Sequence, residues 1–115
     1  MEQIHANMDL IRPGLTFNEF SERAWRIPKE FYGNRYSSLV HGVGLCDEYP
    51  KIVHSPDQTR LGYDGVFEPN MTVCVESYMG VGGGAEGVKL EQQVLVTETG
   101  CEVMTVFPFE ERLLG

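Results

Sequence analysis

The sequence has little of what marks proteins of membranes and nucleic acids. None of its apolar runs approaches the roughly 18 residues that a membrane-spanning helix needs, and its start lacks the cationic and apolar segments of a signal peptide. Only 9 basic residues accompany 17 acidic ones, so a basic surface that could neutralise phosphates is not expected. We therefore expect a cytoplasmic protein that binds neither nucleic acid nor membranes.

Cysteine and histidine are also scarce. The three cysteines, Cys46, Cys74 and Cys101, are odd in number and lack the paired spacing of zinc or redox motifs. We expect reduced, partly buried thiols. Of the three histidines, His5 lies near the N-terminus and His54 in a Ser-Pro turn, so both are expected at the surface.

The first third of the chain is typical of helices. Thr16 and Glu19 form a Thr-x-x-Glu capping box ahead of a helical apolar pattern. This predicts a helix that begins after Thr16 and runs to about residue 32, kinked or interrupted at Pro28. A shorter helix is expected within the first ten residues.

The remainder is typical of strands and loops. Residues 71–78 and 88–96 predict two strands, and residues 103–106 a short third. Glycine and proline interrupt residues 36–70, which predicts short strands joined by long ordered loops. Helices followed by an antiparallel sheet make this an α+β fold.

The two longer strands flank a glycine-rich segment, residues 80–87. It lacks the Gly-Lys-Ser/Thr ending of a phosphate-binding loop, so we interpret it as a hairpin connection. If the hairpin is symmetric about Gly83 and Gly84, Glu76 lies opposite Glu91. Directly opposed like charges are destabilising, so this pair favours a cation between the carboxylates. The alternative is a bulge that shifts the register and separates the two side chains.

His41 stands in an apolar stretch between strand-forming residues. A neutral imidazole there could complete a nitrogen and oxygen ligand set with Glu76 and Glu91, or His41 could be a hydrogen-bonded histidine of the core. Asp47 and Glu48 follow closely. They are either part of a solvated turn or, beside a metal, a general base or proton shuttle.

Three motifs in order, residues 41–50, 68–78 and 87–102, together with the helix start at residues 11–16, resemble the C-terminal half of the pita-bread metalloenzymes. This superfamily comprises methionine aminopeptidase, Xaa-Pro aminopeptidase and creatinase. The resemblance implies that His41, Glu76 and Glu91 are metal ligands, with Glu91 bridging two metals. The family's other ligands are two aspartates on an upstream strand. We therefore expect residues 1–115 to be the C-terminal part of one catalytic domain, with an incomplete site.

Within the superfamily, peptidases carry a histidine where this chain has Glu48. Residues 41–50 resemble instead the branch that cleaves dimethylsulfoniopropionate. That resemblance implies Asp47 as the catalytic base, Tyr36 near the active site, and Glu48 as a third candidate catalytic residue. It implies iron as the metal of a lyase, whereas manganese, cobalt or zinc suit a peptidase.

Three hypotheses follow. The chain is part of a lyase that releases dimethyl sulfide and acrylate, part of an Xaa-Pro aminopeptidase or dipeptidase, or a non-catalytic pita-bread module. The intact parent would act on a small molecule or a short peptide, and the 115 residues alone are expected to be inactive. Sheet edges left without neighbouring strands predict self-association.

Overall fold

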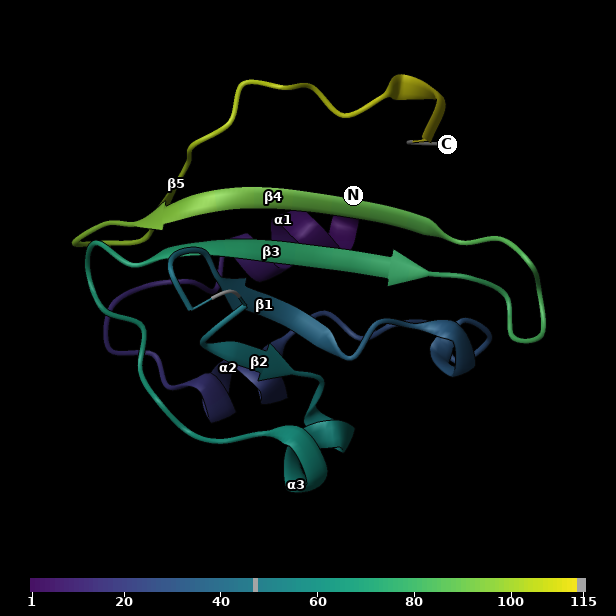
Figure 1. Ribbon diagram of the computed structural model, residues 1–115, viewed down its shortest axis with the longest axis horizontal. Coiled ribbons are helices and arrows are strands. Elements are labelled where there is room, and N and C mark those ends of the chain that lie inside the picture. The colour runs from purple at the N-terminus through teal and green to yellow at the C-terminus, as the bar shows by residue number, and fades with distance from the viewer. Residues whose placement is uncertain (47, 114–115) are drawn as a thin grey trace.

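The computed structural model describes residues 1–46 and 48–113, which fold into helices and one antiparallel sheet (Figure 1). The helices are α1 (Glu2–Met8), α2 (Phe17–Arg23) and α3 (Gln58–Leu61). The strands are β1 (Ser38–Gly42), β2 (Lys51–Val53), β3 (Thr72–Met79), β4 (Val88–Val96) and β5 (Cys101–Val103), in the spatial order β2-β1-β3-β4-β5. The α+β expectation is confirmed. In this described part, every helix is too short or too polar to cross a bilayer.

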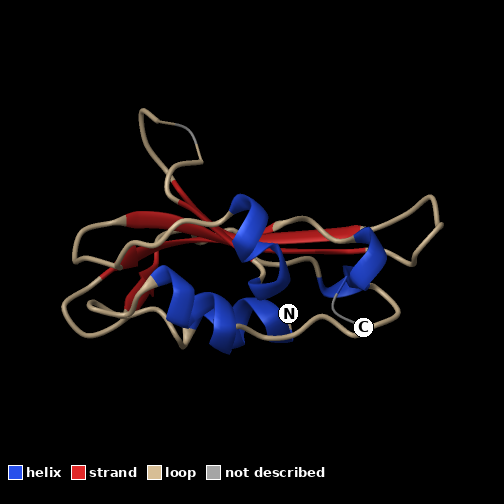
Figure 2. Cartoon of the chain, turned by 90° about the horizontal axis from the view of Figure 1, so that it is seen from below, coloured by secondary structure: helices blue, strands red, loops and turns tan. Residues whose placement is uncertain are grey.

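Helices α1 and α2 lie against one face of the sheet and form the core with it (Figure 2). Val40, Val73, Val75 and Val94 are fully buried on that face. Because side chains of a strand alternate between faces, Cys74 and Glu76 point the other way. The sheet therefore has an apolar face under the helices and a face that can carry polar groups. The buried apolar residues are Ile4, Ile11, Leu15, Phe17, Phe20, Ala24, Leu39, Val40, Ile52, Phe67, Val73, Val75, Val94 and Val96.

The start of α2 is as predicted, but its end is not. Thr16 Oγ1 accepts the Glu19 N–H at 3.1 Å, and a Glu19 carboxylate oxygen accepts the Thr16 N–H at 3.0 Å. The helix ends at Arg23, not near residue 32, because Ala24 is extended with ψ 148°. The Trp25 N–H then donates to Asn7 Oδ1 at 2.9 Å instead of to a helical carbonyl. Contacts with α1 outweigh the helical pattern of this segment.

The hairpin of β3 and β4 has the predicted register, with Glu76 opposite Glu91. The short third strand is confirmed, but it spans Cys101–Val103 and so begins two residues before the expected start at residue 103. A tight turn explains the shift: the Thr97 N–H donates to the Gly100 carbonyl at 2.9 Å, so pairing with β4 resumes at Cys101.

The histidines and cysteines differ in their exposure. His5 is exposed as expected, whereas His54 is buried, at 7% exposure. His54 follows β2 directly and helps to line a cavity of about 130 Å³, whose other walls are formed mainly by the end of α2 and the segment after it. The expectation of a surface His54 is therefore wrong. All three cysteines are free: Cys46 is exposed, Cys101 partly buried and Cys74 buried.

Candidate metal centre

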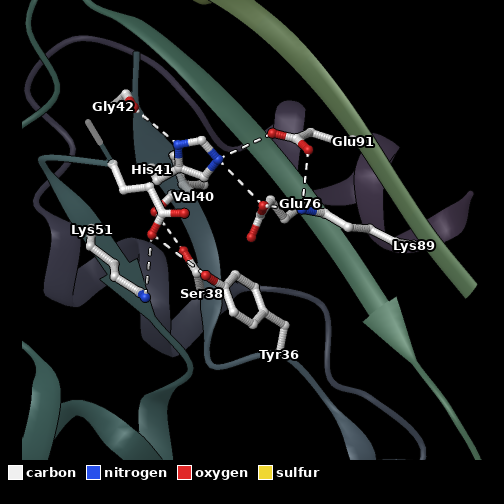
Figure 3. Close-up of polar contacts among 10 residues, drawn as sticks. Tyr36, Ser38, Val40, His41, Gly42, Lys51, Glu76, Lys89 and Glu91 are labelled. Atoms are coloured by element: carbon white, nitrogen blue, oxygen red, sulfur yellow. Dashed lines mark hydrogen bonds and ion pairs between the residues drawn. The ribbon is translucent and has the colours of Figure 1, made fainter. Parts of the chain in front are cut away.

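Five polar side chains meet on the sheet face opposite the helices, and Figure 3 shows four of them: His41, Glu76, Lys89 and Glu91. β1 contributes His41, β3 contributes Cys74 and Glu76, and β4 contributes Lys89 and Glu91. His41 pairs with Cys74, and Glu76 with Glu91. The ladder register of three neighbouring strands thus brings together residues that are up to 50 positions apart.

His41 lies between two carboxylates. Its Nε2 is 3.3 Å from Glu76 Oε1 and 3.1 Å from Glu91 Oε1, and its Nδ1 is 3.0 Å from the Gly42 carbonyl oxygen. A carbonyl can only accept, so Nδ1 carries a proton and Nε2 is the atom that a neutral ring offers to a metal. Burial alone would lower the pKa of His41, but the Gly42 carbonyl and the carboxylates outweigh it and raise that pKa.

Glu76 is the most deeply buried of the acidic groups here. Its side chain is 1% exposed, and its Oε2 has no hydrogen-bond partner among the described residues. A buried carboxylate with a free oxygen is costly unless a cation lies beside it. Together with His41 Nε2 and the Glu91 carboxylate, this gives a nitrogen and oxygen donor set that suits a divalent transition metal.

Lys89 supplies a cation to both carboxylates. Its Nζ is 2.9 Å from Glu76 Oε1 and 3.2 Å from Glu91 Oε2. The hydrogen bond to Glu76 raises the pKa of Lys89, so the ammonium stays charged. Burial tends to raise the pKa of Glu91, but hydrogen bonds from Cys74, Lys89 and His41 outweigh it and lower that pKa. These contacts therefore favour the charged forms of Lys89 and Glu91.

Cys74 also reaches the cluster. His41, Cys74 and Glu91 each offer a ligand atom, and these atoms lie within 4.8 Å of one another. Burial raises the pKa of the Cys74 thiol to about 12. Since the thiolate is the metal-binding form, Cys74 acts near neutral pH as a hydrogen-bond donor to Glu91 rather than as a ligand.

Cys74 and Lys89 were not among the residues predicted for the site. The signal that could have found them is strand alternation, since Cys74 precedes Glu76 by two positions and Lys89 precedes Glu91 by two. Residues two apart on a strand share a face.

Tyr36 and Glu48 lie beside the centre. The Tyr36 hydroxyl donates to Glu48 Oε2 at 3.5 Å, and Lys51 Nζ is 3.7 Å from the same oxygen. The Tyr36 ring lies between two ammonium groups, 5.0 Å from Lys51 Nζ and 5.6 Å from Lys89 Nζ. Tyr36 therefore lies next to Lys89 and its ion pairs. Glu48 does not contact Lys89 itself but is hydrogen-bonded to Tyr36. Asp47 lies outside the described residues.

A cavity of about 330 Å³ opens beside Lys89 and is lined by Arg35, Tyr36, Tyr78 and Lys89. Its volume is within the roughly 300–1,000 Å³ of small-molecule sites. Aromatic rings and two cations make it suitable for a small polar molecule or a short peptide next to the carboxylates.

Comparison with known proteins gives consistent matches. The model of metallopeptidase family M24 matches residues 1–98. The chain is 48% identical, over 99% of its length, to "Dimethylsulfoniopropionate lyase DddP" of Roseovarius nubinhibens, and 35% identical, over 85%, to an Xaa-Pro dipeptidase of Pyrococcus furiosus. It spans 26% and 27% of the length of these two relatives. The structure of prolidase from Pyrococcus furiosus matches 94% of the chain with a TM-score of 0.69 and 27% identity, over 31% of that chain.

Proposed function

The chain belongs to metallopeptidase family M24, and from this we propose that it contributes part of a divalent-metal site to an enzyme of that family. Its helices and antiparallel sheet have the pita-bread fold. Because the chain spans only about a quarter of its curated relatives, the activity of the whole protein is part of the proposal. We also propose that residues 1–115 are the C-terminal part of a cytoplasmic catalytic domain.

The proposed ligands are His41, Glu76 and Glu91. The observation that carries this assignment is Glu76, a buried carboxylate with one unpartnered oxygen that lies beside an imidazole nitrogen and a second carboxylate. A divalent cation held there would supply positive charge that stabilises negative charge building up on a substrate. Iron is the proposed metal for a lyase, and manganese, cobalt or zinc for a peptidase.

The proposed reaction is elimination from dimethylsulfoniopropionate. The Asp47 carboxylate takes a proton from the carbon next to the substrate carboxylate. The electron pair left behind forms a carbon–carbon double bond as the carbon–sulfur bond breaks. The electron pair of the broken bond stays on sulfur, so dimethyl sulfide leaves and acrylate remains. The 48% identity to a protein named for this activity supports the proposal. Tyr36, hydrogen-bonded to Glu48, would position the substrate beside the centre.

Hydrolysis of an Xaa-Pro peptide is the second candidate. It is supported by 35% identity to an Xaa-Pro dipeptidase and by the structural match to a prolidase. Glu48 counts against it, because the peptidases that the chain resembles carry a histidine there.

Calorimetric titration of the chain with Mn²⁺, Zn²⁺ and, without oxygen, Fe²⁺ tests the metal site. We expect Glu76→Gln to weaken binding by at least about tenfold, because an amide oxygen carries no charge. Glu102→Gln, on the exposed part of β5, removes the same charge away from the cluster and should leave the affinity unchanged. Equal affinities of the two variants would contradict the assignment of Glu76. Binding of none of the three metals would favour the non-catalytic module.

The reaction is tested with the longer protein that carries these residues. Release of dimethyl sulfide, measured by gas chromatography, is compared with cleavage of an Xaa-Pro dipeptide. Asp47→Ala should abolish the elimination while the metal stays bound. Retained elimination by this variant would rule out Asp47 as the base, and peptide cleavage alone would favour the second candidate.

A further inference from the structure

The ammonium group of Lys89 makes ion pairs with two of the proposed metal ligands, Glu76 and Glu91. Its Nζ is 2.9 Å from Glu76 Oε1 and 3.2 Å from Glu91 Oε2. His41 Nε2 approaches that same Glu76 oxygen at 3.3 Å and the other oxygen of Glu91 at 3.1 Å. The imidazole and the ammonium therefore share the two carboxylates (Figure 3).

The register of the hairpin makes a cation necessary here even without a metal. Glu76 lies directly opposite Glu91, where like charges repel one another. Glu76 is also 1% exposed, so water does little to screen its charge. Two described side chains lie within ion-pair distance of both carboxylates, His41 and Lys89. Of these, Lys89 carries a charge that does not depend on the protonation of an imidazole.

We propose that Lys89 is an internal counter-ion of the metal centre, which holds Glu76 and Glu91 together in the metal-free chain and is displaced when a metal binds. The inference rests on the proposed metal site. A metal ion and an ammonium group are both attracted to the negative charge of the same two carboxylates, Glu76 and Glu91. Binding of one therefore weakens binding of the other.

Lys89 is well suited to leave. Its side chain is 49% exposed, on a flexible stem, whereas Glu76 is fixed in the sheet at 1% exposure. A second position for the charge lies close by: the Tyr36 ring centroid is 5.6 Å from Lys89 Nζ, at the cavity that Lys89 lines with Arg35, Tyr36 and Tyr78. An ammonium over an aromatic face keeps a favourable cation–π contact after the carboxylates are taken.

The test compares Lys89→Met with Lys29→Met in the full chain. Lys29 is exposed, belongs to no strand and makes no ion pair with Glu76 or Glu91, so this control removes the same charge without changing their ion pairs. The Kd for Mn²⁺ is measured by calorimetry, and the melting temperature of the metal-free chain by circular dichroism. We expect Lys89→Met to bind Mn²⁺ about tenfold more tightly than the unchanged chain. Its metal-free melting temperature should fall below that of the Lys29→Met control.

The two measurements separate the ways in which the proposal can fail. If Mn²⁺ binds but Lys89→Met has an unchanged or higher Kd, competition is ruled out while the metal site stands. If neither chain binds Mn²⁺, the proposed metal site is overturned together with the competition. An unchanged melting temperature of the metal-free Lys89→Met chain would overturn the role of Lys89 as counter-ion. Lys89→Arg, which keeps the charge, should keep the metal-free stability.

Discussion

His54 is buried in the wall of a small cavity, close to the ion pair of Arg35 and Asp57. Burial, and next the charge of Arg35, lower the pKa of His54 from its ordinary 6.5 to about 4. The unfolded chain therefore binds a proton at a pH where the folded chain does not. His54 contributes stability that is fully present above pH 6.5 and is lost as the pH falls through the interval down to about 4.

We predict that the free energy of unfolding falls by up to about 3 kcal/mol on account of His54 when the pH is lowered from 7 to below 4. His54→Gln, which takes up no proton, should show a smaller fall, and the exposed His5→Gln should behave as the unchanged chain. Urea unfolding at a series of pH values measures this. Because the carboxylates titrate in all three chains, equal slopes for His54→Gln and His5→Gln would contradict the prediction.

The residues of the site differ in how well the sequence predicts them. A symmetric hairpin and an apolar histidine leave a site of His41, Glu76 and Glu91 as one of two interpretations, and the family resemblance favours it. The structure brings the three together. Burial of His54 could not be predicted, because it depends on how α2 and the segment after it pack on the end of β2. The Ser-Pro turn that follows His54 is typical of the protein surface, so the sequence alone predicts an exposed histidine.

At the scale of elements, β1 and the segment before β2 approach each other closely beside His41, and this contact holds the backbone that orients the His41 ring. The Gly42 N–H donates to the Pro50 carbonyl at 2.7 Å, and a Cβ on Gly42 would collide with the Tyr49 carbonyl. Glycine is therefore required next to His41, whose Nδ1 is held by the carbonyl of Gly42 itself.

Gly42→Ala should destabilise the fold by about 2 kcal/mol or more, because backbone must move to make room for the methyl group. It should also weaken Mn²⁺ binding, since the Gly42 carbonyl orients His41. Gly44→Ala is the matched control, because a Cβ there meets nothing within 4 Å. Urea unfolding and calorimetry measure both effects. A Gly42→Ala chain as stable as Gly44→Ala would show that this segment does not pack against β1 as described.

The hairpin was predictable as an element because both strands run from one glycine-rich turn, and pairing across such a turn sets the register. The end of α2 was not. Apolar residues after Arg23 continue a helical spacing. Ala24 and Ile27 are indeed buried, but they belong to a segment that leaves the helix at Ala24. Local periodicity does not distinguish a helix from an extended segment that packs on the core at the same points.

At the scale of the whole molecule, two forces oppose one another in self-association. The sheet ends in the short strand β5, which has no strand on its outer side among the described residues. An open edge of this kind offers backbone groups to a second chain. The formal net charge of −8 makes two copies repel one another. Added salt screens the repulsion over a Debye length of about 8 Å at 0.15 M and leaves backbone pairing nearly unaffected.

We predict that the chain self-associates through this edge and that the dimer fraction rises with sodium chloride concentration. Val103, half exposed on β5, is the position at which a lysine should block pairing, since charged residues protect natural sheet edges. Val81→Lys is the control. Val81 is exposed in the turn of the hairpin, so this substitution introduces the same charge outside β5. Sedimentation velocity at several protein and salt concentrations measures the outcome. A chain that stays monomeric at high salt, or a Val103→Lys chain that dimerises as strongly as Val81→Lys, would contradict association through β5.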